Sequence, residues 1–241
     1  MSQTHHIQIG QQEVALRIER TRGRSIRLLY KPELRMFILR TPSGNVDTQA
    51  RLFLQKQEAW MLKRLQKAEL TDKRAIRFHA DLEAGLLPFL GEGYQLIRTQ
   101  GPRRKIEHSA ESRQIHLTLQ AQDEDWKAFL RESLKLLAKD ILPDRTFALA
   151  KATESTVNKI FIKGQKTRWG SCSNLSNVNL NWHMIFMPPP LIDYVIIHEL
   201  MHLRELNHSP KFWAWVERYY PNYKQAEKEI RQYEWMIGIL D

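Results

Sequence analysis

Three histidines and one glutamate near the C-terminal end of the chain have the residue types and spacing of a metal site. His198, Glu199 and His202 form the sequence H-E-x-x-H. On a helix with 3.6 residues per turn, positions i and i+4 share a face, so both imidazoles can bind one ion while the glutamate reaches a water beside it. Catalytic zinc usually has three protein ligands and one open position. His208 is the nearest candidate for the third ligand, and the chemistry this predicts is zinc-assisted hydrolysis.

Other assignments of the third ligand stay open from spacing alone. The distance from His202 to His208 equals that of the metzincins, but those proteins carry a glycine where this chain has Glu205. A second zincin pattern uses a glutamate from a later helix, and the candidates for it are Glu217, Glu227 and Glu229. His208 remains the preferred ligand. Two core histidines bonded to backbone are a weaker explanation, because a glutamate lies between them at metal-site spacing.

The segment that carries the motif has the pattern of a buried helix. Residues 192–203 are apolar almost all round, apart from the glutamate and the two histidines. Pro188, Pro189 and Pro190 precede it and start the helix, and Asn207 tolerates the left-handed conformation that ends one. Ser209 followed by Pro210 predicts the N-cap and first position of the next helix. The third histidine therefore lies in a turn between two helices.

Strands and a helix precede this segment. Period-two patterns predict strands at 159–163, 167–171 and 178–184, and the last is a candidate edge strand that could pair with an extended peptide. Helical spacing after Asp123 predicts a helix to about residue 141. Pro143 then marks an end or a kink before a second helix at 144–152.

The first half of the chain is predicted to be mostly β-structure with one helix. Two hairpins are expected, one from 86–90 and 94–99 and one from 105–108 and 114–119. The helix is expected from an N-cap at Asp47 to about residue 67, followed by a charged connection. The fold class is α+β: a zincin-like catalytic domain at 123–241, with a small antiparallel sheet and helices carrying the motif, after a β-rich region at 1–122.

Composition and charge indicate the cellular compartment and the kinds of partner. The 241 residues are 42% hydrophobic and 27% charged, as in folded soluble proteins, and no apolar run approaches a membrane span. Cys172 is the only cysteine, so a reducing compartment, the cytoplasm, is expected. The formal net charge of +10 attracts polyanions such as nucleic acid or a nucleotide, although a solvated basic surface explains it equally well.

Four groups of residues together resemble the YgjP-like metallopeptidase family, relatives of the SprT/Spartan-type zinc proteases. They are Arg168-Trp169-Gly170-Ser171-Cys172, Asn179-Leu180-Asn181-Trp182, Tyr194-Val195-Ile196-Ile197-His198-Glu199-Leu200 and Asn207-His208-Ser209 through Phe212-Trp213. The resemblance is strong from about residue 160 to 233 and looser upstream, where it rests on Arg24-Ser25-Ile26-Arg27-Leu28, Pro42 and Phe89-Leu90-Gly91. It implies a small zincin-like domain that binds zinc through His198, His202 and His208, with Glu199 as the base.

Three functions follow as hypotheses. The first is a zinc metallopeptidase that hydrolyses peptide bonds in a peptide or protein substrate, with Arg168 and His183 as candidates to stabilise an oxyanion and Asn181 as a further substrate contact. The second, which the resemblance adds, is a metal-dependent pyrophosphatase acting on nucleoside triphosphates, notably UTP. The third is a nucleic-acid-associated protein with a structural zinc, which would have no need of Glu199.

Overall fold

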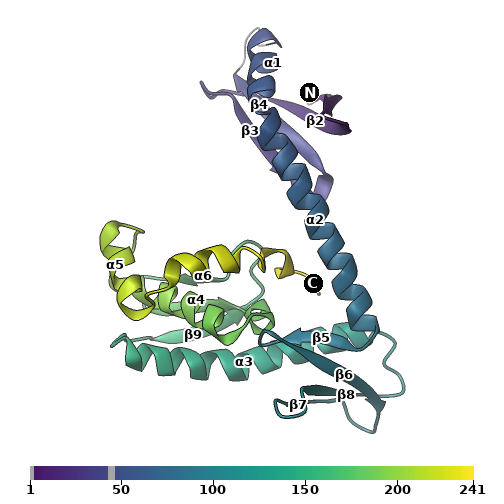
Figure 1. Ribbon diagram of the computed structural model, residues 1–241, viewed down its shortest axis with the longest axis vertical. Coiled ribbons are helices and arrows are strands. Elements are labelled where there is room, and N and C mark those ends of the chain that lie inside the picture. Colours follow the sequence, from purple (N-terminus) through teal and green to yellow (C-terminus); the bar gives the residue numbers. More distant parts are fainter. Residues whose placement is uncertain (1–2, 43–46) are drawn as a thin grey trace. The chain divides into compact units, whose positions relative to one another are not determined.

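The computed structural model describes residues 3–42 and 47–241, and they form two compact units (Figure 1). The first unit is Met1–Arg74 and the second is Ala75–Asp241. The described residues contain six α-helices and three small sheets, so the α+β class is confirmed. The predicted boundary between residues 122 and 123 falls inside the second unit, and the division into a β-rich region and a catalytic domain stays a prediction.

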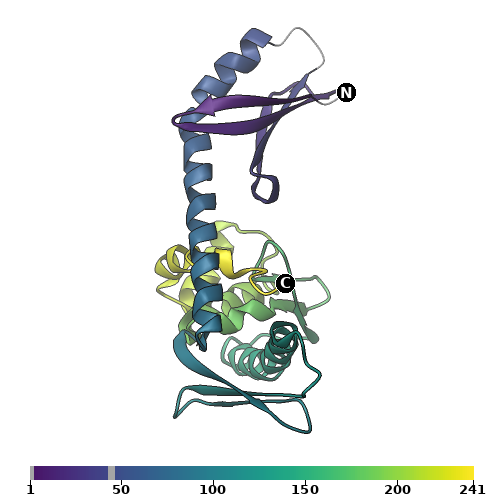
Figure 2. The ribbon, with the colours of Figure 1, turned by 90° about the vertical axis from the view of Figure 1, so that its right-hand side faces the viewer.

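The first unit is a four-stranded sheet with helices on one face. Its strands are β1 (Gln3–Ile9), β2 (Gln12–Thr21), β3 (Arg27–Lys31) and β4 (Met36–Pro42), in the order β1-β2-β4-β3. The hairpin of β1 and β2 is the long two-stranded ribbon of Figure 2. Alternate residues of these strands pack with α1 (Asp47–Lys56) and the first part of α2 (Glu58–Glu83) into a core of their own. Residues 43–46, between β4 and α1, lie outside the described residues, as does the side chain of Asp47.

The second unit begins with a sheet that repeats this topology. Its strands are β5 (Leu86–Phe89), β6 (Glu92–Gln100), β7 (Lys105–Ser109) and β8 (Gln114–Leu119), in the order β5-β6-β8-β7. In both sheets the outer pairs are antiparallel and the central pair is parallel. The two predicted hairpins are confirmed, and the sequence analysis missed that the four strands before them form the same arrangement.

Two helices are longer than the sequence predicted. Helix α2 continues to Glu83 where a charged connection was expected, and Glu69–Lys73 and Arg77–Asp81 are ion pairs one turn apart along it. Helix α3 (Trp126–Ala152) runs through Pro143 without ending.

The continuity of α3 follows from its buried stripe. Every fourth residue from Leu130 to Ala150 is buried, so ending the helix at Pro143 would expose half of that stripe. The one backbone hydrogen bond that Pro143 cannot donate costs less free energy than the helix gains by burying the rest of the stripe. Despite their length, neither α2 nor α3 nor any other described helix is long and apolar enough to cross a membrane.

The rest of the second unit surrounds one buried helix. A three-stranded sheet contains β9 (Lys159–Lys163), β10 (Gly170–Cys172) and β11 (Asn177–Asn181) in the order β10-β11-β9. Helix α4 (Pro189–Met201) contacts α3, α6 (Tyr223–Ile230) and this sheet, and α5 (Pro210–Tyr219) follows it (Figure 1).

One strand prediction was wrong in a way that matters for the site. The segment 178–184 was expected to be an edge strand, but β11 pairs with β10 on one side and with β9 on the other. Its apolar residues alternate with asparagines because one face of the strand, that of Val178 and Leu180, packs in the core, and residues 182–186 turn into a 3-10 helix. The edge strand of this sheet next to the motif is β10.

Candidate metal centre

Helix α4 presents the H-E-x-x-H motif from the interior of the second unit. Pro188 is its N-cap residue and Pro189 its first position, as the prolines predicted. The first turn is fixed on α3, because the Arg145 guanidinium binds the Asp193 carboxylate through two hydrogen bonds. Nine residues of the helix are buried, including Glu199. The helix is thus a largely buried, rigid support for the motif.

The turn after α4 brings the third histidine back to the first two. The predicted N-cap is confirmed, since the Ser209 hydroxyl accepts a hydrogen bond from the backbone N–H of Phe212 at 3.3 Å. Asn207 does not adopt the left-handed conformation expected of it. Its side-chain carbonyl instead accepts from the N–H of Ser209 at 3.0 Å, a local bond that closes the turn. His208 is held directly beside this turn.

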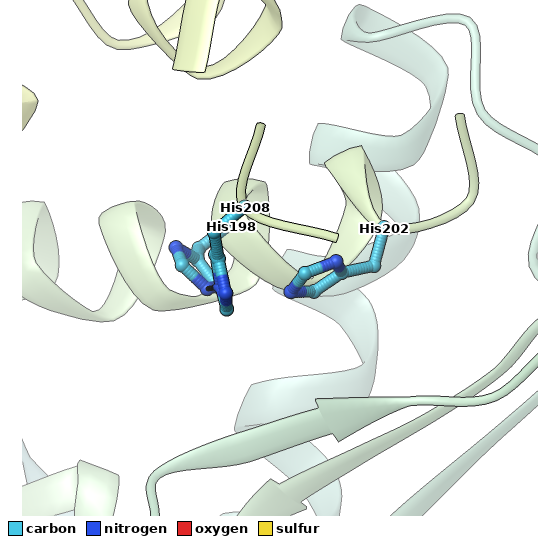
Figure 3. A group of neighbouring side chains, drawn as sticks. All are labelled: His198, His202 and His208. Atoms are coloured by element: carbon cyan, nitrogen blue, oxygen red, sulfur yellow. Dashed lines mark hydrogen bonds between the residues drawn. The ribbon is translucent and has the colours of Figure 1, made fainter. Parts of the chain in front are cut away.

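The three imidazoles converge on one point, as Figure 3 shows. One ligand atom from each of His198, His202 and His208 lies within 4.8 Å of the other two. Nε2 of His198 and Nε2 of His208 are 3.0 Å apart. Two nitrogens at about 2.0 to 2.1 Å from one tetrahedral ion are separated by about 3.3 Å, so this spacing fits a shared metal.

The donor set also has the right protonation. Burial, followed by the neighbouring His202 and His208, lowers the pKa of His198 to about 3. Burial also lowers the pKa of His202, whose Nδ1 donates to the carbonyl oxygen of Glu205 at 3.1 Å. That bond leaves the Nε2 lone pair of His202 for a metal, the usual arrangement of a histidine ligand. The residues present therefore fit a metal ion.

An aromatic residue of α5 supports all three rings. Phe212 is fully buried, stacks on His202 with ring centroids 4.5 Å apart, and meets His198 and His208 edge-on at 4.9 and 4.8 Å. Phe212 belongs to a segment on which the family resemblance rests, but the sequence did not predict a role for it at the site. Its position four residues after His208 was the feature of the sequence that could have indicated this role.

Glu199 lies under the edge strand β10. Its side chain is 7% exposed, and burial raises its pKa to about 8 while the charge of Arg168 opposes the shift. Gly170 leaves room for the carboxylate: a Cβ on this residue would lie 2.7 Å from both Cγ and Oε1 of Glu199. A larger residue at 170 would displace Glu199, so the glycine of the Arg-Trp-Gly-Ser-Cys segment has a structural reason that the sequence alone did not reveal.

A pocket of about 520 Å³ joins these groups. The three histidines, Glu199 and Arg168 line it, together with Gly170, Ser171 and Cys172 of β10. Tyr194 also lines it, one turn before His198 on the same face of α4, and its signal was this i, i+4 spacing. Burial raises the pKa of Tyr194, so its hydroxyl keeps its proton and can donate.

Two of the predicted contact residues lie elsewhere. Asn181 and His183 are both fully buried, and neither lines the pocket. The Asn181 amide donates to the carbonyl oxygens of Gln165 and Arg168 at 2.7 and 3.0 Å, and its oxygen accepts from His183. The other ring nitrogen of His183 accepts from the N–H of Gly238 at 3.0 Å. These bonds use every polar group of both side chains, so this placement does not support contact with a substrate.

The chain matches one protein-family model and several solved structures. A family model described as YgjP-like, metallopeptidase domain, matches residues 24–233. Among solved structures, the metallopeptidase zymogen abylysin of Pyrococcus abyssi is 22% identical over 38% of this chain and 93% of its own, with a TM-score of 0.36. The metallopeptidase zymogen jannalysin of Methanocaldococcus jannaschii is 25% identical over 38% of this chain and 94% of its own, with a TM-score of 0.34. No curated protein matches the chain.

Proposed function

Because the chain belongs to the YgjP-like metallopeptidase family, we propose that His198, His202 and His208 hold a zinc ion in a zincin-like site and that Glu199 is the general base. The observation that carries this proposal is the convergence of three imidazoles within 4.8 Å, in one pocket with a buried carboxylate. Family membership supports a metallopeptidase and hence a metal ion, and the donor set supports zinc.

Zinc fits this donor set better than the other common hydrolytic metals. Imidazole nitrogens suit zinc, whereas magnesium and calcium prefer carboxylate and carbonyl oxygens. The only carboxylate of the motif, Glu199, is set apart under β10 instead of joining the histidine cluster. A zinc ion held by three histidines supplies a Lewis acid that polarises a carbonyl and makes a water molecule more acidic.

Glu199 is suited to accept a proton and then return it. Its raised pKa lies near neutral pH, and the positive charges of Arg168 and of a cation at the histidines both favour the ionised form. A carboxylate oxygen of Glu199 takes a proton from a water molecule while the oxygen of that water attacks the peptide carbonyl carbon. When the C–N bond breaks, the same carboxyl gives that proton to the leaving amine.

Arg168 and Tyr194 are our candidates for the groups that face the substrate carbonyl. Both line the pocket, and each can donate a hydrogen bond at neutral pH. Asn181 fixes Arg168 indirectly, because its amide holds the carbonyl of that residue. Donors of this kind stabilise the negative charge that develops on the carbonyl oxygen.

Strand β10 is our candidate for the binding site of an extended peptide. It is the edge of the three-stranded sheet, and all three of its residues line the pocket. A peptide that pairs with its main chain would lie directly over the carboxylate of Glu199. The edge-strand role that the sequence analysis gave to 178–184 therefore passes to Gly170–Cys172.

The test is to compare the wild type with Glu199→Gln and His208→Ala. Metal content is measured first, and each protein is then assayed on an unfolded protein substrate and on UTP. We expect about one zinc per wild-type chain, retained in Glu199→Gln with peptidase activity at least about 10²-fold lower, and lost in His208→Ala.

Each other result has a definite meaning. Zinc binding by His208→Ala equal to that of the wild type would move the third ligand to another residue. Hydrolysis of UTP that depends on Glu199, with no peptidase activity, would establish a nucleotide pyrophosphatase. Zinc without any hydrolysis would leave a structural zinc as the explanation.

A further inference from the structure

The net positive charge of the chain lies almost entirely in its first unit. Residues 1–74 contain 15 of the 37 lysines and arginines but only seven of the 27 acidic residues, a net charge of +8 out of +10. The second unit is more than twice as long and carries the remaining +2. The unit with the histidine cluster is therefore close to neutral, and attraction for a polyanion is a property of the other unit.

Arginines occupy the face of the first sheet that points away from its core. Side chains alternate along each strand, and the inward residues of β2, β3 and β4 include Leu16, Leu28 and Leu39. Their neighbours Arg17, Arg27 and Arg40 therefore lie on the opposite face. The helices of the unit, α1 and α2, pack on the inward residues. Within the first unit, no described helix covers the arginine face.

Two of these arginines repel each other, and one ion pair within the sheet offsets only part of this repulsion. Arg27 and Arg40 are directly opposite each other in the antiparallel pair of β3 and β4, a placement that destabilises a sheet when the charges are alike. Glu19 accepts from Arg40 at 3.0 Å. Arg22 and Arg24, in the connection that leads into β3, are exposed and have no ionic partner within the described residues. An anionic ligand would relieve this repulsion.

The second sheet shows that the topology does not require these charges. At the position that corresponds to Arg27 and Arg40, Lys105 lies opposite Thr118. Lys105 is also ion-paired with Glu107 at 2.7 Å, and Arg113 with Glu92 at 3.1 Å. The same strand arrangement thus has balanced charges in one unit and concentrated arginines in the other.

We propose that the arginine face of the first unit, formed by Arg17, Arg27 and Arg40, binds the phosphate backbone of nucleic acid together with the exposed Arg22 and Arg24 of the connection into β3. Arginine forks match phosphate oxygens, and a flat sheet face can follow a repeating anionic backbone. No described Phe, Tyr or Trp of β1 to β4 lies on this face, so it has no platform for stacking bases. Binding is therefore independent of base sequence. This inference concerns a surface other than the metal centre.

The experiment measures binding of the full chain to a fluorescent 30-base-pair DNA duplex across a range of salt concentrations. The variant replaces Arg22, Arg24 and Arg27 by Gln. The matched control replaces Arg103, Lys105 and Arg113 by Gln, which removes the same amount of positive charge from the strands and turns of the second sheet. Affinity of the wild type should fall steeply with salt. The first-sheet variant should bind about 10²-fold more weakly at 0.1 M salt, with a log–log salt slope smaller by about 3, and the control should bind as the wild type does.

Three outcomes would overturn the proposal: no salt-dependent binding by the wild type, equal losses in both variants, or binding to phosphatidylserine vesicles without binding to DNA. Thermal unfolding and zinc content of each variant are measured in parallel, so that a folding defect is recognised. In that case single Arg24→Gln and Arg113→Gln proteins replace the triple variants, with an expected slope change of about 1 for the first only. Because zinc content and peptidase activity are separate readouts, failure here leaves the proposed function intact.

Discussion

Replacing Gly170 by alanine tests the assignment of Glu199 without touching a ligand or the base. The added Cβ would lie 2.7 Å from Cγ and Oε1 of Glu199 and 2.9 Å from Cδ. Ordinary contacts of a Cβ begin at 3.4 Å, so the carboxylate must move by about 0.7 Å. Gly170 does not have a positive φ, so the alanine backbone itself is compatible with the strand. The clash with Glu199 is the principal consequence.

A displacement of this size is large for a general base. Misplacement by about 1 Å costs about 10²-fold in rate, so the variant should lose peptidase activity by a factor between about 10 and 10², or about 1.4 to 2.7 kcal/mol of transition-state stabilisation. Zinc content should stay at the wild-type level, because the three atoms nearest to the new methyl group all belong to Glu199 and not to a metal ligand. Rates are measured on an unfolded protein substrate and metal by elemental analysis.

The stability of the same variant provides an internal control. Overpacking costs about 1 to 3 kcal/mol, and the lower entropy of an unfolded chain with alanine offsets about 0.4 to 1 kcal/mol of this. In a Glu199→Ala background the clash is absent, so Gly170→Ala should then be neutral or stabilising. Urea unfolding of the four proteins gives the coupling free energy, expected at about 1 to 3 kcal/mol. A coupling of zero, or wild-type activity in Gly170→Ala, would refute the close approach of β10 to Glu199.

Three further predictions concern the surroundings of the site. Gly91→Ala should lower the free energy of unfolding by about 2 to 4 kcal/mol in urea, because Gly91 has φ +81° and its Cβ would lie 2.5 Å from Cα of Pro188; an unchanged midpoint would contradict this. Tyr194→Phe should lower kcat by about 10²-fold with little change in KM and zinc content, and an equal rise in KM would instead indicate substrate binding. Burial lowers the pKa of His183 from 6.5 to about 4. The contribution of this neutral ring to the free energy of unfolding is therefore complete above pH 6.5, and about 3 kcal/mol is lost as pH drops towards 4. His183→Asn should lack this part of the pH dependence in urea unfolding, and equal slopes in both proteins would exclude it.

Local pattern was sufficient to predict the parts of the site that depend on neighbouring residues in sequence. The Ser209 cap, the helix start at Pro188 and the two hairpins of the second sheet all follow from short-range geometry, and all are confirmed. The convergence of His208 on the other two histidines also required only a short turn. These features are local because one or two hydrogen bonds define each of them.

The features that the sequence did not predict depend on contacts between distant segments. Strand β11 has the alternation of an edge strand, but β9 and β10 flank it, and pairing partners leave no mark on the strand itself. Pro143 looked like a helix end, and only the buried stripe of α3 explains why the helix continues. Asn181 and His183 have polar groups typical of a catalytic residue, yet all of these are used to hold the segment of Arg168 and the C-terminal residues.

The two sheets of identical topology explain why hydrophobic pattern alone could not assign a role to the N-terminal half. In both, one face packs on helices, so their apolar residues alternate in the same way. The second sheet supports the metal helix through a tight approach: the hairpin glycine Gly91 meets Pro188, and the N–H of Leu90 donates to the carbonyl of Ile185 at 2.6 Å. The first sheet has arginines opposite each other where the second has balanced charges. Since the buried faces are equivalent, the difference between the two sheets lies in exposed charged side chains, which a hydrophobic pattern does not distinguish.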